Sequence, residues 1–135
     1  MKRIGGLKLL EEREGEGMPA SKGDRVMFNI RLFLNKGDEV LLNETQAKHL
    51  PKEMIRVVDG VTLIDRTIVL GRREAMAGVE HALMGMKAGG YRKVRVSPHL
   101  AYRDKGIPGL VLPDALLIAE IWLRGFVQER KVHVP

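Results

Sequence analysis

The most regular pattern in the sequence is an alternation of apolar and other residues over Arg25–Leu34. Four apolar residues fall on one face of an extended strand in this run: Val26, Phe28, Ile30 and Leu32. Lys22–Asp24 precedes the run, Asn35–Asp38 is typical of a hairpin turn, and Glu39–Leu42 is the expected returning strand. An apolar strand face must be covered, so the pattern requires a sheet that packs on a core.

Other segments repeat this strand character between glycine and proline breaks. They are Leu7–Glu12, Asp65–Leu70, Tyr91–Val96 and Leu116–Leu123. The run Ile55–Ile64 is interrupted by Asp59–Gly60, a dipeptide suited to the positive φ angles of a type I′ turn, so we expect a hairpin there. Asn43–Leu50 has weak helical character, which Pro51 interrupts.

A clear helical period is visible in the segment Arg72–Met86. Its apolar residues recur at helical spacing: Met76, Val79, Leu83 and Met86. Ala88–Gly90 is expected to end this short amphipathic helix. Many strands and one short helix predict an α+β fold, with an antiparallel sheet packed on the helix, in a single domain over residues 1–135.

Composition excludes several kinds of chemistry. The chain has no cysteine, which excludes disulfides and thiolate metal sites. The four histidines lack the spacing of metal ligands; they are His49, His81, His99 and His133. We therefore expect neither a metal site nor a cofactor. Met1–Glu12 is too charged for a signal peptide, and no run approaches the roughly 18 apolar residues of a membrane span. The expected location is therefore the cytoplasm.

The formal charge of +6 is unevenly distributed along the chain. Up to Thr67 there are 12 Lys and Arg against 11 Asp and Glu, whereas from Ile68 onward there are 11 against 6. A basic surface favours acidic partners or nucleic acid. Aromatic residues make up only 4% of the chain, too few for a base-stacking surface, so we do not expect nucleic-acid binding.

The order of the punctuated segments in the second half is specific. These segments are Leu70–Gly71, Glu74–Gly78, Leu83–Gly89, Val94–Pro98, Leu100–Tyr102, Gly106–Ala115 and Leu117. Together with Lys22–Asp24 and the turn at Gly37, they resemble the FKBP-type peptidyl-prolyl isomerases. The resemblance runs from about Gly15 to Phe126, is weaker in the first half, and is absent across about Asn43–Ile64.

The resemblance implies a strongly bent antiparallel sheet of about five strands wrapped around one short helix, with an apolar cleft between them. It also implies that residues 43–64 are an insertion at the edge of that cleft. The implied activity is rotation of X-Pro peptide bonds, which requires no acid, base, metal or cofactor. Apolar walls and one or two hydrogen-bond donors favour the twisted amide over both planar forms.

The family's cleft residues can be transferred one by one. Tyr102, whose counterpart donates to a ligand carbonyl, is retained, and the resemblance also assigns the aliphatic positions Ala75, Met76, Leu110 and Val111. The family's aromatic walls are lost: they correspond to Ile30, Val40, Val79 and Ala119, and one more lies near Arg66. Leu41 replaces an aspartate and Arg103 a glycine.

Two functions therefore remain open. The first is a weak peptidyl-prolyl isomerase in which Tyr102 acts on the substrate carbonyl, with Val40, Met76, Val79 and neighbouring apolar residues around the proline. The second is a catalytically inactive protein-binding or chaperone-like module that uses the altered cleft and the insertion. Either function has proline-containing peptides or unfolded protein chains as partners, and loss of the aromatic walls argues against tight macrolide binding.

Overall fold

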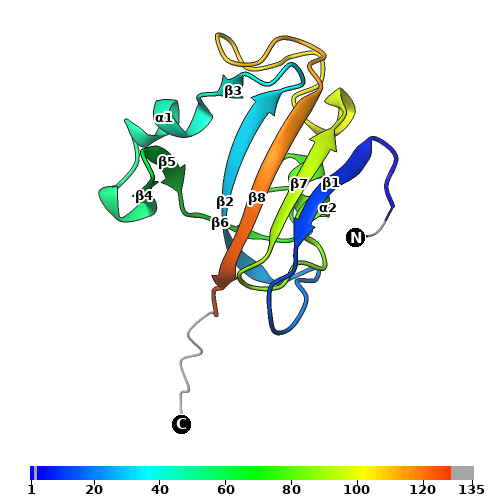
Figure 1. The fold of residues 1–135 in the computed structure, drawn as a ribbon, viewed down its shortest axis with the longest axis vertical. Coiled ribbons are helices and arrows are strands. Elements are labelled where there is room, and N and C mark those ends of the chain that lie inside the picture. The colour runs from blue at the N-terminus through cyan, green and yellow to red at the C-terminus, as the bar shows by residue number, and fades with distance from the viewer. Residues whose placement is uncertain (2, 129–135) are drawn as a thin grey trace.

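The fold is built on a six-stranded antiparallel sheet. The computed structural model describes residues 1 and 3–128. The strands of this sheet are β1 (Leu7–Arg13), β2 (Arg25–Leu34), β3 (Glu39–Val40), β6 (Arg66–Val69), β7 (Tyr91–Val96) and β8 (Leu117–Phe126). Their order is β1-β7-β8-β2-β3, and β6 pairs with β2. Figure 1 shows the long, curved strands β2 and β8 at the centre of the sheet.

One main helix, α2 (Ala77–Leu83), lies behind the sheet and packs on β7 and β8 (Figure 1). Its residues Val79 and Leu83 join the alternating residues of β2 in a continuous buried core. The predicted α+β architecture is therefore confirmed. A short 3₁₀ helix (Pro98–Leu100) follows β7.

Helix α2 is shorter than the helical pattern over Arg72–Met86. Met76 has extended backbone angles before the helix, and Met84 leaves the helical region with φ −59° and ψ 127°, after which Gly85 takes a φ of +82°. The preceding loop is held by carboxylates, because Glu74 accepts a hydrogen bond from the Val69 N–H and Glu80 accepts one from the Gly71 N–H. These bonds fix residues 72–76 as a connection between sheet and helix.

The segment between β3 and β6 folds into a small subdomain beyond the edge of the sheet (Figure 1). It contains α1 (Leu42–Ala47), a 3₁₀ helix (Lys52–Met54), β4 (Ile55–Val58) and β5 (Val61–Ile64). The predicted hairpin is confirmed, since β4 and β5 pair antiparallel and Asp59 and Gly60 both have positive φ, 50° and 78°. We refer to residues 42–64 as the cover segment.

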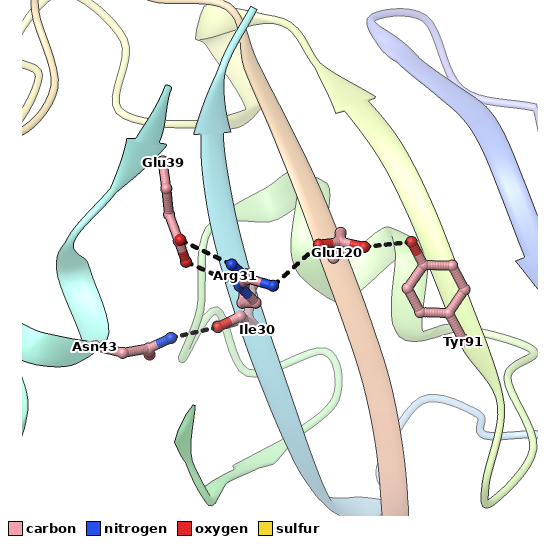
Figure 2. Close-up of polar contacts among 6 residues, drawn as sticks. All are labelled: Ile30, Arg31, Glu39, Asn43, Tyr91 and Glu120. Atoms are coloured by element: carbon pink, nitrogen blue, oxygen red, sulfur yellow. Dashed lines mark hydrogen bonds and ion pairs between the residues drawn. The ribbon is translucent and has the colours of Figure 1, made fainter. Parts of the chain in front are cut away.

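The cover segment is anchored where the edge of β2 lacks a partner strand. β6 pairs with residues 25–28 of β2 and β3 pairs with residues 32–33, while β8 occupies the other edge. Between them, the buried Asn43 amide donates to the Ile30 carbonyl at 2.7 Å, as Figure 2 shows. The buried Asn29 amide donates to the Ile64 carbonyl and to Asp65, both at 2.8 Å. The Asn43 amide thus satisfies a backbone carbonyl of β2 that no strand reaches, and the Asn29 amide ties the end of the cover segment to the same strand.

A polar network crosses the face of the sheet that points away from α2 (Figure 2). Arg31 on β2 makes two 2.8 Å bonds to Glu39 on β3 and lies 3.9 Å from Glu120 on β8. The Tyr91 hydroxyl on β7 donates to Glu120 at 2.6 Å. Four neighbouring strands are therefore joined by side chains as well as by their backbones.

Within the described part of the chain, no helix has the length and apolar character needed to span a membrane.

The close contact between α2 and β7 can be tested at Gly78. A Cβ at this position would overlap the Val96 side chain and lie 3.2 Å from the Leu100 carbonyl oxygen. We expect Gly78→Ala to lower the free energy of unfolding by about 1–3 kcal/mol, the usual cost of overpacking. Gly125→Ala is the control, because nothing lies within 4 Å of its added Cβ, and it should change stability by no more than about 0.5 kcal/mol. Equal denaturation midpoints for the two variants would contradict this packing.

The anchor of the cover segment should be sensitive to acid. Arg56, followed by Asn29, holds the pKa of Asp65 below its ordinary value through hydrogen bonds. A lowered folded-state pKa stabilises the protein fully above the unfolded-state value of about 4, and this stabilisation is lost as the pH falls through the folded-state pKa. The melting temperature should therefore fall more steeply below about pH 4 in the wild type than in Asp65→Asn.

Asp38→Asn is the matched control for this titration, since its ion pair with Lys36 is exposed, with 71% of the Asp38 side chain accessible. It should keep the wild-type slope. Differential scanning calorimetry from pH 7 to pH 2.5 gives the melting temperature at each pH. Parallel slopes of melting temperature against pH for the wild type and Asp65→Asn would show that Asp65 does not anchor the segment in this way.

Candidate ligand-binding cleft

A cleft of about 660 Å³ opens between the inner face of the sheet, the start of α2 and the cover segment. The lining residues come from five parts of the chain. They are Phe28, Ile30 and Leu32 of β2; Leu42, Gln46, His49, Leu50, Met54 and Ile64 of the cover segment; Arg66, Thr67 and Ile68 of β6; and Arg73, Glu74, Ala75, Met76, Val79 and Tyr102. This volume matches that of pockets that take small molecules or short peptide segments.

The floor of the cleft is apolar because it is the exposed end of the core. Alternation along β2 directs Phe28, Ile30 and Leu32 towards the helix, where Val79 meets them. The resemblance assigns a tryptophan to the position of Val79, and a valine fills far less of the space above the sheet.

The cover segment supplies the wall that faces α2. Leu42 and Gln46 lie one helical turn apart on α1, so both can face the cleft. Leu50 and Met54 follow on either side of Pro51 and add flexible apolar surface. The segment that the family resemblance does not cover thus supplies five of the residues that line the cleft: Gln46, His49, Leu50, Met54 and Ile64.

Tyr102 places a polar group at this apolar cleft. It lies in the loop after the 3₁₀ helix and is partly buried. Burial raises the pKa of the Tyr102 hydroxyl, and the nearby charge of Arg66 opposes this shift. The hydroxyl therefore stays protonated at neutral pH and can donate a hydrogen bond to an acceptor in the cleft.

Arg66 brings a positive charge into the same cleft. Its Nη2 donates to Asn43 Oδ1 at 2.9 Å and to Gln46 Oε1 at 2.6 Å, so it joins β6 to α1. Burial lowers the pKa of the Arg66 guanidinium, but an arginine keeps its charge in proteins. The cleft is consequently apolar at its floor and cationic at one wall.

Half of the residues that the sequence assigns to the site line this cleft. They are Ile30, Ala75, Met76, Val79 and Tyr102. The others are not among its lining residues: Val40, Leu41, Leu110, Val111 and Ala119. Val40 and Ala119 are buried and pair with Leu32 from opposite sides of β2.

Leu41 is 52% exposed just before α1. Val111 is buried and Leu110 partly buried in the loop before β8, where Ile107 and Val111 form a backbone bridge. The binding roles assigned to these residues stay predictions.

Several lining residues were absent from the assigned site. Phe28 and Leu32 carried a signal, since they share the strand face of Ile30. Gln46, His49, Leu50 and Met54 carried none, because weak helical character and a proline do not show which way a segment folds back. Their place in the cleft depends on the anchor at Asn43.

The chain is similar to known proteins over most of its length. The model of the FKBP-type peptidyl-prolyl cis-trans isomerase family matches residues 16–124. FK506-binding protein 1A of Neurospora crassa is 25% identical over 124 residues, which cover 91% of this chain and 90% of that protein. The FK506-binding protein of Neisseria meningitidis is 28% identical over 120 residues, or 89% of this chain and 95% of the relative.

A longer relative and a solved structure are also similar to this chain. FK506-binding protein 4 of Aspergillus fumigatus is 26% identical over 117 residues, but this chain spans only 20% of its length. The crystal structure of AtFKBP13 shares the fold, with a TM-score of 0.69, 22% sequence identity, and coverage of 90% of this chain and 94% of that one. The family match runs from before β2 into β8 and contains both Tyr102 and the loop before the last strand. This chain therefore belongs to the FKBP-type peptidyl-prolyl cis-trans isomerase family.

Proposed function

We propose that this protein binds X-Pro segments of proteins in the cleft and isomerises the X-Pro bond slowly. The observation that carries the proposal is the protonated Tyr102 hydroxyl beside an apolar cleft of about 660 Å³. Family membership supplies the reaction class. Met76 and Val79 provide apolar surface on the helix side, and Phe28 and Ile30 provide it on the sheet side.

Rotation about an X-Pro bond is opposed by amide resonance, with a barrier of about 20 kcal/mol. The planar amide is the more dipolar form, so removal of water from its carbonyl in an apolar cleft weakens the preference for planarity. A hydrogen bond from Tyr102 then fixes the position of that carbonyl while the proline ring turns against the apolar floor. Only contacts that are stronger in the twisted form accelerate the reaction.

The expected rate is low because two floor positions to which the resemblance assigns aromatic rings carry aliphatic side chains. Each aromatic ring offers about 150–250 Å² of contact surface, and Ile30 and Val79 occupy positions where the family resemblance assigns rings. Leu50 and Met54 of the cover segment recover part of that surface. Tight binding of FK506, for which the relatives are named, is not expected in a cleft without these rings.

A second function is a catalytically inactive protein-binding or chaperone-like module. The observation that favours it is the contribution of the cover segment to the cleft, which provides a binding surface outside the family pattern. Unfolded, proline-containing chains are the expected partners, and the cytoplasm remains the predicted location.

Tyr102→Phe tests the enzyme function. Loss of one hydroxyl should lower kcat/KM for a blocked Leu-Pro peptide by about three- to tenfold, the effect of one hydrogen bond made in the transition state. Exchange NMR or a protease-coupled assay measures the rate. The chain has two tyrosines, so Tyr91→Phe is the matched control: its hydroxyl bonds Glu120 away from the cleft, and the rate should not change. Absence of any acceleration by the wild type at high protein concentration would exclude the enzyme.

The double variant Leu50→Ala, Met54→Ala tests whether the cover segment binds ligand. Removal of this apolar wall should weaken binding of a permanently unfolded, proline-containing chain by about tenfold, measured by fluorescence anisotropy. Val57→Ala is the control, because Val57 lies in the same segment, is 66% exposed, and does not line the cleft. Unchanged binding by the double variant, with its fold intact by circular dichroism, would remove the cover segment from the binding surface.

A further inference from the structure

The positive charge of Arg66 is not neutralised by a carboxylate within the described part of the chain. The two hydrogen bonds of Arg66 go to the neutral amide oxygens of Asn43 and Gln46, and both use Nη2. Its Nε–H is buried from solvent and has no acceptor among the described residues. The described residues therefore provide no counter-ion for this charge and leave the Nε–H donor unused.

Other arginines at the sheet edge show the more usual arrangement. Arg31 makes a two-bond pair with Glu39, and Arg56 makes one with Asp65. In each pair the carboxylate accepts two parallel hydrogen bonds, from Nε and Nη2, and neutralises the guanidinium charge. Arg66 lines the cleft without a carboxylate partner among the described residues, and its Nε–H remains available to an oxygen of an oxyanion that enters the cleft.

The remaining charged residues of the cleft leave room for an anion. Arg73 adds a second positive charge at the rim, and His49 is exposed. Glu74 is the one acidic residue among those that line the cleft, and its Oε1 accepts a hydrogen bond from the Val69 N–H. The overall charge of +6 would further attract an acidic ligand. Burial of an unpaired cation costs free energy, which a bound carboxylate would recover.

We infer that the cleft selects X-Pro segments in which a residue next to the proline carries a side-chain carboxylate, and that Arg66 binds this carboxylate. The inference rests on the proposed function, because it assigns a substrate class to the same cleft. Arg66 then acts as a specificity residue: Tyr102 contacts the backbone carbonyl, and the guanidinium reads the neighbouring side chain.

The first experiment uses the wild-type chain and peptides with blocked ends, so that a side chain provides the only carboxylate. Ala-Glu-Pro-Phe is compared with Ala-Gln-Pro-Phe and Ala-Leu-Pro-Phe, and Ala-Pro-Glu-Phe with Ala-Pro-Gln-Phe. At least one glutamate peptide should bind about tenfold more tightly than its glutamine isostere, the size of a hydrogen bond to a charged group. Titration followed by ¹H–¹⁵N spectra gives Kd, and the Arg66 Nε–H resonance should shift with the glutamate peptide.

The second experiment removes the charge. Arg66→Met should abolish the preference for glutamate over glutamine while the Leu-Pro peptide still binds, and Arg66→Lys should keep part of the preference. Arg72→Met is the matched control, because Arg72 is an exposed neighbour of the rim that does not line the cleft, and the preference should persist. If Arg66→Met does not fold, the wild-type peptide series and Arg66→Lys still decide the matter.

The outcomes separate this inference from the proposed function. No binding or isomerisation of any peptide overturns the proposed function. Equal affinity for glutamate and glutamine peptides, with turnover of both, overturns the role of Arg66 and leaves the proposed function standing. A preference lost equally in Arg66→Met and Arg72→Met, or lost in about 0.3 M salt, would assign it to net charge and overturn the specific contact. Tighter binding of a phosphoserine-proline peptide would overturn the carboxylate in favour of phosphate.

Discussion

The structure depends on how the outer edge of β2 is satisfied. β8 pairs with the whole of one edge, but two short strands share the other and leave Ile30 between them. A buried carbonyl without a partner would cost about 1–3 kcal/mol, and the Asn43 amide removes that cost. The same bond fixes the start of α1, and with it the wall of the cleft. One backbone gap in the sheet therefore determines where the cover segment sits.

Much of the fold could be predicted from the sequence because it is encoded by local patterns. The bounds of β2 and β7 agree with the alternating runs from which they were predicted, and Asp59–Gly60 forms the expected turn. The length of α2 was overestimated because the apolar period continues to Met86, whereas the backbone already leaves the helical region at Met84. Side-chain spacing does not report such backbone conformations.

The cleft was less predictable, for a physical reason. Ile30, Met76, Val79 and Tyr102 lie on segments where the family resemblance holds, and they line the cleft together. From the sequence, the resemblance placed one of the family's wall phenylalanines only near Arg66. Its environment depends on Asn43 and Gln46, which come from a segment outside the resemblance. The contacts of Arg66 join the part of the chain that resembles the family to a segment that does not. Neither the family pattern nor the local pattern of that segment predicts such contacts.

The Asn43 side chain has two tasks, since its nitrogen donates to Ile30 and its oxygen accepts from Arg66. A ligand that draws the Arg66 guanidinium towards itself would compete with the amides that hold α1 against the sheet. Occupancy of the cleft and attachment of the cover segment are then thermodynamically linked. Ligand selectivity and the mobility of this segment would be two aspects of one equilibrium, and a substitution that changes one would change the other.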